Sequence, residues 1–223
     1  MIQGRGIAGG KFLTYLTIAI SAAAALQYFV LHWTLIFDPM PLAMREAAPI
    51  VIGEAYAGQL KGGDVFPYSE EHYPQSTSVY GPVYTMLTGT LQAFLDSNPY
   101  TIHRVSVAFA IVISALICGG LVWRRANFHS GFLAAVWFYL LHVASMTVTA
   151  GPSAHAVLFY VIGMAAILYF GPSRWGLLIS IGAGFLGLLT KPYVSLLIPG
   201  VLIYVYLFHS PRRALITAGI TAV

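Results

Sequence analysis

The sequence predicts an all-α fold, a polytopic transmembrane helical bundle with interfacial helices in its first outer loop. Two observations carry this prediction, the composition and the lengths of the apolar runs. Of 223 residues, 58% are hydrophobic and only 8% are charged, and the mean hydropathy is +0.79. A soluble domain carries about 25% charged residues. Because so few charged side chains cannot cover a water-soluble globule, lipid must be the solvent for much of this chain.

Apolar segments approach the length of about 20 helical residues that a bilayer core requires. These segments are 12–37, 103–123, 131–150, 154–171, 175–190 and 192–208. A further one, 214–223, is incomplete at the last residue. A helix that stops inside hydrocarbon leaves carbonyl groups unsatisfied, so we expect either a fragment or a partner chain that completes the fold. Without an internal repeat, residues 1–223 form a single transmembrane domain.

The orientation depends on the segment 81–95, which is apolar but short and contains threonines. If it lies along the interface instead of spanning, most basic residues fall on the side of the N-terminus: Arg5, Lys11, Arg124, Arg125, Arg174, Arg212 and Arg213. The positive-inside rule then makes the N-terminus cytoplasmic. Residues 38–102 become an outer loop that holds all seven acidic residues, and residues 41–60 suit an amphipathic helix on the membrane surface.

The charge and the cysteine content exclude two classes of protein. The net charge is +4, but the basic residues are dispersed over short loops between helices. Membrane topology explains this distribution, and we expect no nucleic-acid partner. The single cysteine, Cys118, lies in an apolar run, so no disulfide framework exists.

Ionisable residues beside the membrane are the first functional candidates. Asp38 follows the first span, Lys191 stands between two apolar spans, and Arg104 opens the second span. Lysine and arginine both recognise phosphate. Each residue also has an ordinary explanation: Asp38 can end a helix in water, Lys191 can snorkel, and Arg104 can anchor to lipid headgroups.

Weaker candidates lie in the same outer region. Glu70, Glu71 and His72 could hold a divalent metal ion, although a solvated charge run explains them better. His155 could act as an acid, a base or a ligand. Tyr80 and Tyr84 could stack on a sugar, or belong to the aromatic belt of the interface. The cofactor is therefore unknown, with a divalent ion as the one candidate.

The order of several motifs resembles the N-terminal half of the GT-C glycosyltransferases. Asp38 is followed by IGEAYAGQ at 52–59 and by YGPVYTMLTGTL at 80–91. Arg104, the basic turn WRR at 123–125 and the pair Lys191-Pro192 come next. This superfamily contains the protein O-mannosyltransferases and the lipid A aminoarabinose transferases. The resemblance covers roughly residues 12–208 and rests on pattern and topology more than on one tight signature.

The resemblance implies an inverting glycosyltransferase that takes a sugar from a polyprenyl phosphate at the outer membrane face, in the style of bacterial inner-membrane enzymes. Asp38 would be the catalytic base. Lys191, Arg104, Tyr80, Tyr84 and His155 would bind substrate.

The sequence departs from the family pattern in two places. Tyr80 and Gly81 replace a Glu-Lys pair, and Ser153 replaces an acid. The chain is also shorter than a typical member.

Two other functions remain open at this point. One is a transporter or flippase of a lipid-linked or anionic substrate. The apolar spans, however, hold few ionisable side chains, mainly His32 and His142, and transporters are often built from repeats. The other is a non-catalytic membrane assembly partner.

Overall fold

The computed structural model describes residues 5–39, 47–62, 82–95, 97–144, 151–212 and 214–215. Over these residues the fold is all-α with no strand, which confirms the predicted fold class. The elements are α1 (Arg5–Ile36), α2 (Ala47–Leu60), α3 (Pro82–Phe94), α4 (Pro99–Arg125), α5 (Phe128–Ala144), α6 (Ser153–Phe170), α7 (Arg174–Leu188), the 3₁₀ helix η2 (Pro192–Leu196) and α8 (Leu197–Phe208).

Three of the described helices are long and apolar enough to cross a membrane: Lys11–Ile36 within α1, all of α4, and all of α6. The helices α5, α7 and α8 are apolar but shorter. With 15 residues, α7 extends about 22 Å at 1.5 Å per residue, less than the roughly 30 Å of a hydrocarbon core. The incomplete segment 214–223 lies almost entirely outside the described residues.

Proline divides the segment 192–208, which the sequence predicts as one span, into η2 and α8. Pro199 has no N–H to donate, so it fits only the first turn of a helix. Accordingly α8 begins two residues earlier, at Leu197. The helix α4 begins at Pro99, before the apolar segment that starts at 103. The side chain of Asn98 caps this helix, because it accepts a hydrogen bond from the Tyr100 amide at 2.8 Å.

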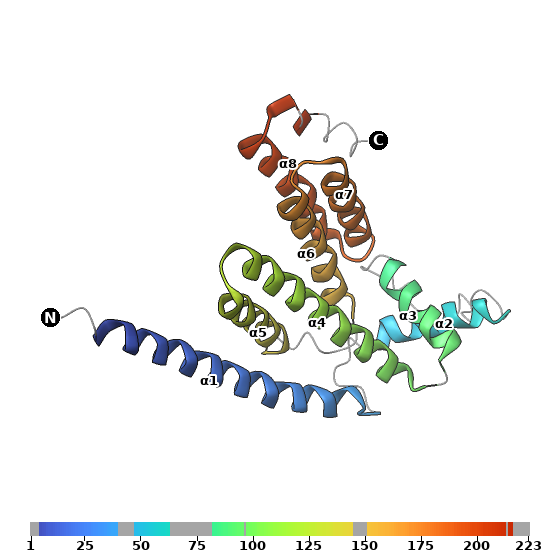
Figure 1. Ribbon diagram of the computed structural model, residues 1–223. Coiled ribbons are helices and arrows are strands. Elements are labelled where there is room, and N and C mark those ends of the chain that lie inside the picture. The colour runs from blue at the N-terminus through green and yellow to red at the C-terminus, as the bar shows by residue number, and fades with distance from the viewer. Residues whose placement is uncertain are drawn as a thin grey trace.

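The long helices pack as two groups (Figure 1). In the first, α4 and α5 form an antiparallel hairpin with α1 alongside. Helices α4 and α5 approach each other closely at Gly119 and Gly131, where a Cβ on Gly119 would lie 2.8 Å from the Gly131 carbonyl oxygen. In the second group, α6, α7 and α8 pack together, and Ser180 of α7 donates to the Gly163 carbonyl of α6 at 2.6 Å. The packing of α4 against α6 joins the groups.

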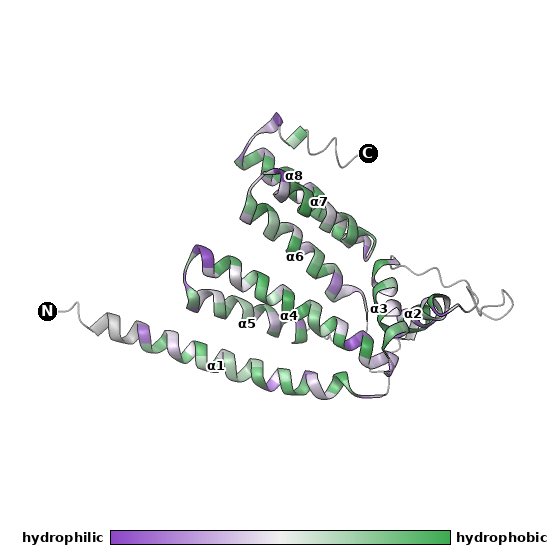
Figure 2. Cartoon of the chain, turned by 45° about the vertical axis from the view of Figure 1, so that its right-hand side comes forward, coloured by the Kyte–Doolittle hydropathy of each residue, from purple (hydrophilic) through white to green (hydrophobic). Residues whose placement is uncertain are grey.

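The colouring by hydropathy shows apolar residues over much of these helices, with hydrophilic residues between them (Figure 2). Many of the large apolar side chains are exposed. On α1, for example, Phe12, Ile20, Val30 and Trp33 are all more than half exposed. Large apolar side chains on the outside are costly in water and favourable in lipid. This arrangement is the one expected where lipid surrounds the helices.

The direction of the chain defines two ends of the bundle. At one, which we name the basic end, the rings of Tyr15 and His129 lie 5.9 Å apart and the guanidinium of Arg124 lies 3.9 Å above the Tyr169 ring. These contacts bring together the first half of α1, the α4–α5 turn and the end of α6. At the other, the Asp38 end, α1 finishes, α4 and α6 begin, and α7 turns into η2.

The pair α2 and α3 lies at the Asp38 end (Figure 1). The two helices cross tightly, since a Cβ on Gly89 of α3 would lie 2.6 Å from the Gly53 carbonyl oxygen of α2. With only 13 residues, α3 is too short to cross a bilayer core. Its buried face carries the polar side chains Thr85, Thr88 and Gln92. The pair therefore holds polar groups against the start of α4.

Candidate functional site

Arg104 lies completely buried at the start of α4, 0% exposed. Its Nη1 donates to the main-chain carbonyl of Leu35 at 3.0 Å and to that of Asp38 at 2.6 Å. These carbonyls belong to the C-terminal end of α1 and the residues after it, where a helix leaves its last acceptors without intrahelical donors. Arg104 thus fixes the turn that carries the Asp38 carboxyl group, and in this conformation its contacts are those of a positioning residue.

A buried aromatic cluster continues from Arg104 toward α6. The hydroxyl of Tyr84 on α3 hydrogen-bonds with Nδ1 of His103 at 2.9 Å. The same tyrosine ring lies 4.9 Å from the ring of His155 on α6. Tyr84 is 1% exposed, so it is enclosed between the two histidines. We infer that it supports the site from within, and it does not present an open ring face to a sugar.

His155 connects α6 to α4. Its Nε2 lies 2.8 Å from the Ser106 hydroxyl, one turn along α4 from His103. Its Nδ1 is buried without a hydrogen-bond partner among the described residues. A buried polar atom without a hydrogen-bond partner lowers the stability of the folded protein. His155 therefore combines a fixed orientation with one unused nitrogen.

Lys191 reaches the start of α6 from the α7–η2 turn. Its Nζ donates to the Ser153 hydroxyl at 2.8 Å. Beside it, the main-chain amide of Val83 on α3 donates to the Leu189 carbonyl at 3.3 Å. Lys191, the start of α6 and the start of α3 thus meet at one place, at the same end of the bundle as Asp38.

An apolar cleft of about 590 Å³ opens next to this polar cluster. Leu87 and Leu91 of α3 form one wall, together with Leu95, which directly follows that helix. The start of α4 and of α6 form the remainder, including Ser106 and His155. The lining is thus mostly apolar, with polar side chains at Ser97, Thr101 and the Ser106–His155 pair, and such a mixture suits an amphipathic ligand.

The structure places five of the residues that the sequence singles out at the same end of the bundle: Asp38, Tyr84, Arg104, His155 and Lys191. Tyr80 and the metal candidates Glu70, Glu71 and His72 lie outside the described residues. Within the described part of the chain, no group of three or more His, Cys, Asp or Glu side chains gathers as metal ligands would.

Sequence reasoning missed Ser106 and Gln92. The Gln92 side chain is 8% exposed, and both its amide atoms lack a hydrogen-bond partner among the described residues. The sequence does indicate that Gln92 belongs to a polar helix face, because Thr85, Thr88 and Gln92 follow one another at intervals of three and four residues. Ser106 follows His103 by three residues and shares its face in the same way.

Comparison with protein-family models, with curated proteins and with solved structures found no match to this chain.

Proposed function

We propose that this protein is a glycosyltransferase of the GT-C type, which moves a sugar from a polyprenyl phosphate to an acceptor at the Asp38 end of the bundle. The supporting observation is that a carboxylate and an ammonium group, Asp38 and Lys191, lie at one end of a bundle with lipid-compatible walls. The contacts of Arg104, Tyr84, His155 and Ser153 connect the elements that carry them. A transfer from a lipid phosphate needs both groups on one side of the membrane.

Asp38 is the proposed general base. The acceptor hydroxyl oxygen attacks the anomeric carbon of the sugar, and its proton passes to the Asp38 carboxylate. The bond between that carbon and the phosphate oxygen breaks, and the electron pair stays on the phosphate. Direct displacement of this kind inverts the anomeric configuration. The Arg104 contact acts on the main-chain carbonyl of Asp38, so it orients the turn that carries the carboxylate.

Lys191 is the proposed partner of the lipid phosphate. Its ammonium group lies at the N-terminus of α6, on Ser153, where the amides of the first turn have no intrahelical acceptor. The helix dipole favours negative charge at the same place. Charge that develops on the departing phosphate would be stabilised there. The apolar cleft beside His155 offers a path for the polyprenyl chain.

The test is transfer by the purified protein in proteoliposomes supplied with radiolabelled polyprenyl-phosphate sugars. Asp38→Asn should lower transfer by about 10²- to 10⁴-fold, the usual contribution of a general base. It should leave the melting temperature unchanged, since asparagine keeps the main-chain carbonyl that Arg104 holds. Glu54→Gln is the matched control, because Glu54 is an exposed carboxylate of α2 at the same end. Equal transfer by the two variants would refute the proposed base.

A further inference from the structure

A second apolar cleft lies between α4 and α6, near the basic end. Its volume is about 540 Å³. Ile117, Gly120 and Leu121 of α4 face Ala165, Tyr169 and Phe170 of α6 across it. This cleft is separate from the one beside His155, with which it shares no residue. The proposed glycosyl transfer makes no use of it.

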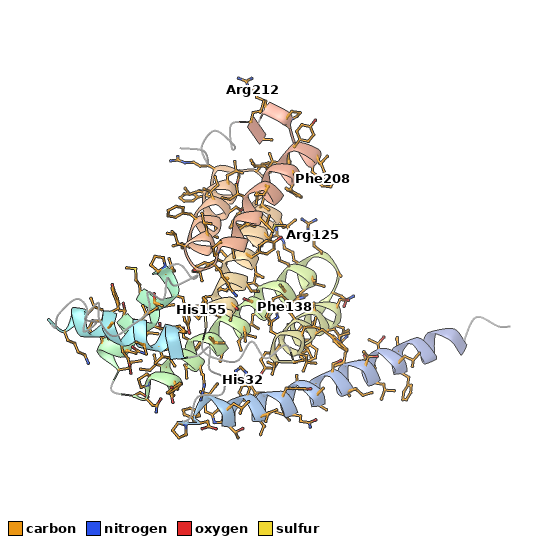
Figure 3. The ribbon with its side chains drawn as sticks, turned by 180° about the vertical axis from the view of Figure 1, so that it is seen from behind. His32, Arg125, Phe138, His155, Phe208 and Arg212 are labelled. Atoms are coloured by element: carbon orange, nitrogen blue, oxygen red, sulfur yellow. The ribbon has the colours of Figure 1, made fainter. Side chains whose placement is uncertain are left out.

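Two exposed arginines stand at the end of this cleft. The guanidinium of Arg124 lies 3.9 Å above the ring of Tyr169, which itself lines the cleft. Arg125 donates from Nη2 to the Leu168 carbonyl at 3.2 Å. That bond uses one of the five N–H groups of a guanidinium. Figure 3 shows Arg125 at the end of α4 and His155 in the region where α4 and α6 begin.

We infer that this cleft binds an anionic phospholipid, with one acyl chain between α4 and α6 and the headgroup phosphate on Arg124 and Arg125. Guanidinium groups bind phosphate oxygens through paired donors. Basic residues beside a gap between membrane helices are the arrangement that recognises anionic headgroups. The apolar walls identify the source of the phosphate, because a soluble anion gains nothing from contact with leucine and phenylalanine.

A substitution on α4 can fill the cleft and leave both arginines unchanged. A Cβ on Gly120 would meet no atom within 4 Å, and Gly120 lines the cleft. Phenylalanine at this position therefore fills the space that an acyl chain would take. Gly200 on α8 is a matched control, because its Cβ would also meet open space and it is not among the residues that line this cleft.

The experiment measures binding of dioleoyl phosphatidylglycerol to the full chain by native mass spectrometry and by the shift in melting temperature, with dioleoyl phosphatidylcholine as the neutral comparison. We expect phosphatidylglycerol to stabilise the protein more than phosphatidylcholine does. Arg124→Gln and Arg125→Gln should each weaken its binding by roughly fivefold. Gly120→Phe should also reduce binding, whereas Gly200→Phe should not. Each variant is compared with its own lipid-free melting temperature, which separates lost binding from lost stability.

Three results would overturn the inference. The first is an equal response to the two phospholipids. The second is binding that survives both the arginine substitutions and Gly120→Phe. The third is a stabilisation that inorganic phosphate reproduces at the same concentration, since the acyl chain would then have no role.

Discussion

Arg104 donates to the main-chain carbonyl of Asp38 at 2.6 Å, across 66 residues of sequence. The contact joins the end of α1 to the start of α4, and it holds the main chain that carries the Asp38 carboxylate. Because Arg104 is 0% exposed, the protein must supply acceptors for its guanidinium, and the carbonyls of Leu35 and Asp38 are two of them.

Arg104→Met should destabilise the protein by about 3 kcal/mol, because it removes the hydrogen bonds that a charged donor makes to the carbonyls of Leu35 and Asp38. Thermal unfolding in detergent, followed by size-exclusion chromatography, measures the change. Arg212→Met is the control, since Arg212 is an exposed arginine at the opposite end. If the two variants unfold at the same temperature, Arg104 does not hold the turn.

Tyr84→Phe should cost about 1 kcal/mol of stability. It removes the hydroxyl that bonds His103 at 2.9 Å but keeps the ring beside His155. The equivalent change at Tyr160, which is 41% exposed on α6, should have little effect. Chemical unfolding of both variants gives the comparison, and a loss at Tyr160 as large as that at Tyr84 would contradict the buried network.

Alanine substitution at two neighbouring glycines of α4, Gly119 and Gly120, should change the stability of the protein in opposite directions. Gly119→Ala should destabilise by about 1–3 kcal/mol, since its Cβ would lie 2.7 Å from the Ala135 Cβ and 2.8 Å from the Gly131 carbonyl oxygen. Gly120→Ala meets open space and should be neutral or stabilising, because alanine favours helix by up to about 1 kcal/mol over glycine. Melting temperatures of the pair test the crossing of α4 and α5. If the two variants changed the melting temperature equally, α4 and α5 would not cross at Gly119.

Lys191 and Glu54 should be accessible from one side of the membrane and Arg212 from the other. In a Cys118→Ala background, single cysteines are introduced as Lys191→Cys, Glu54→Cys and Arg212→Cys. A membrane-impermeant maleimide applied to intact spheroplasts should label the first two alike and the third only after permeabilisation. Labelling of Lys191→Cys together with Arg212→Cys would separate Lys191 from Asp38 by the thickness of a bilayer and remove the proposed site.

The sequence was sufficient for the helical class and the approximate positions of the helices, because apolar runs and capping residues are local signals. Hydropathy marks an apolar run such as 103–123 but not the ends of the helix that contains it, and α4 begins at Pro99 after the Asn98 cap. Within the run 192–208, the structure has η2 followed by α8, in keeping with the effect of Pro199 on the hydrogen bonds of a helix.

The sequence by itself determined that the chain is apolar and helical, and that its acidic residues all fall between the first two long helices. Only the tertiary structure decided that Arg104 is buried under the end of α1, that Tyr84 is enclosed by His103 and His155, and that Lys191 reaches Ser153. The physical reason is the range of each interaction. Helix formation depends on residues three and four apart, whereas these contacts join helices that lie far apart in sequence and meet only when the bundle packs.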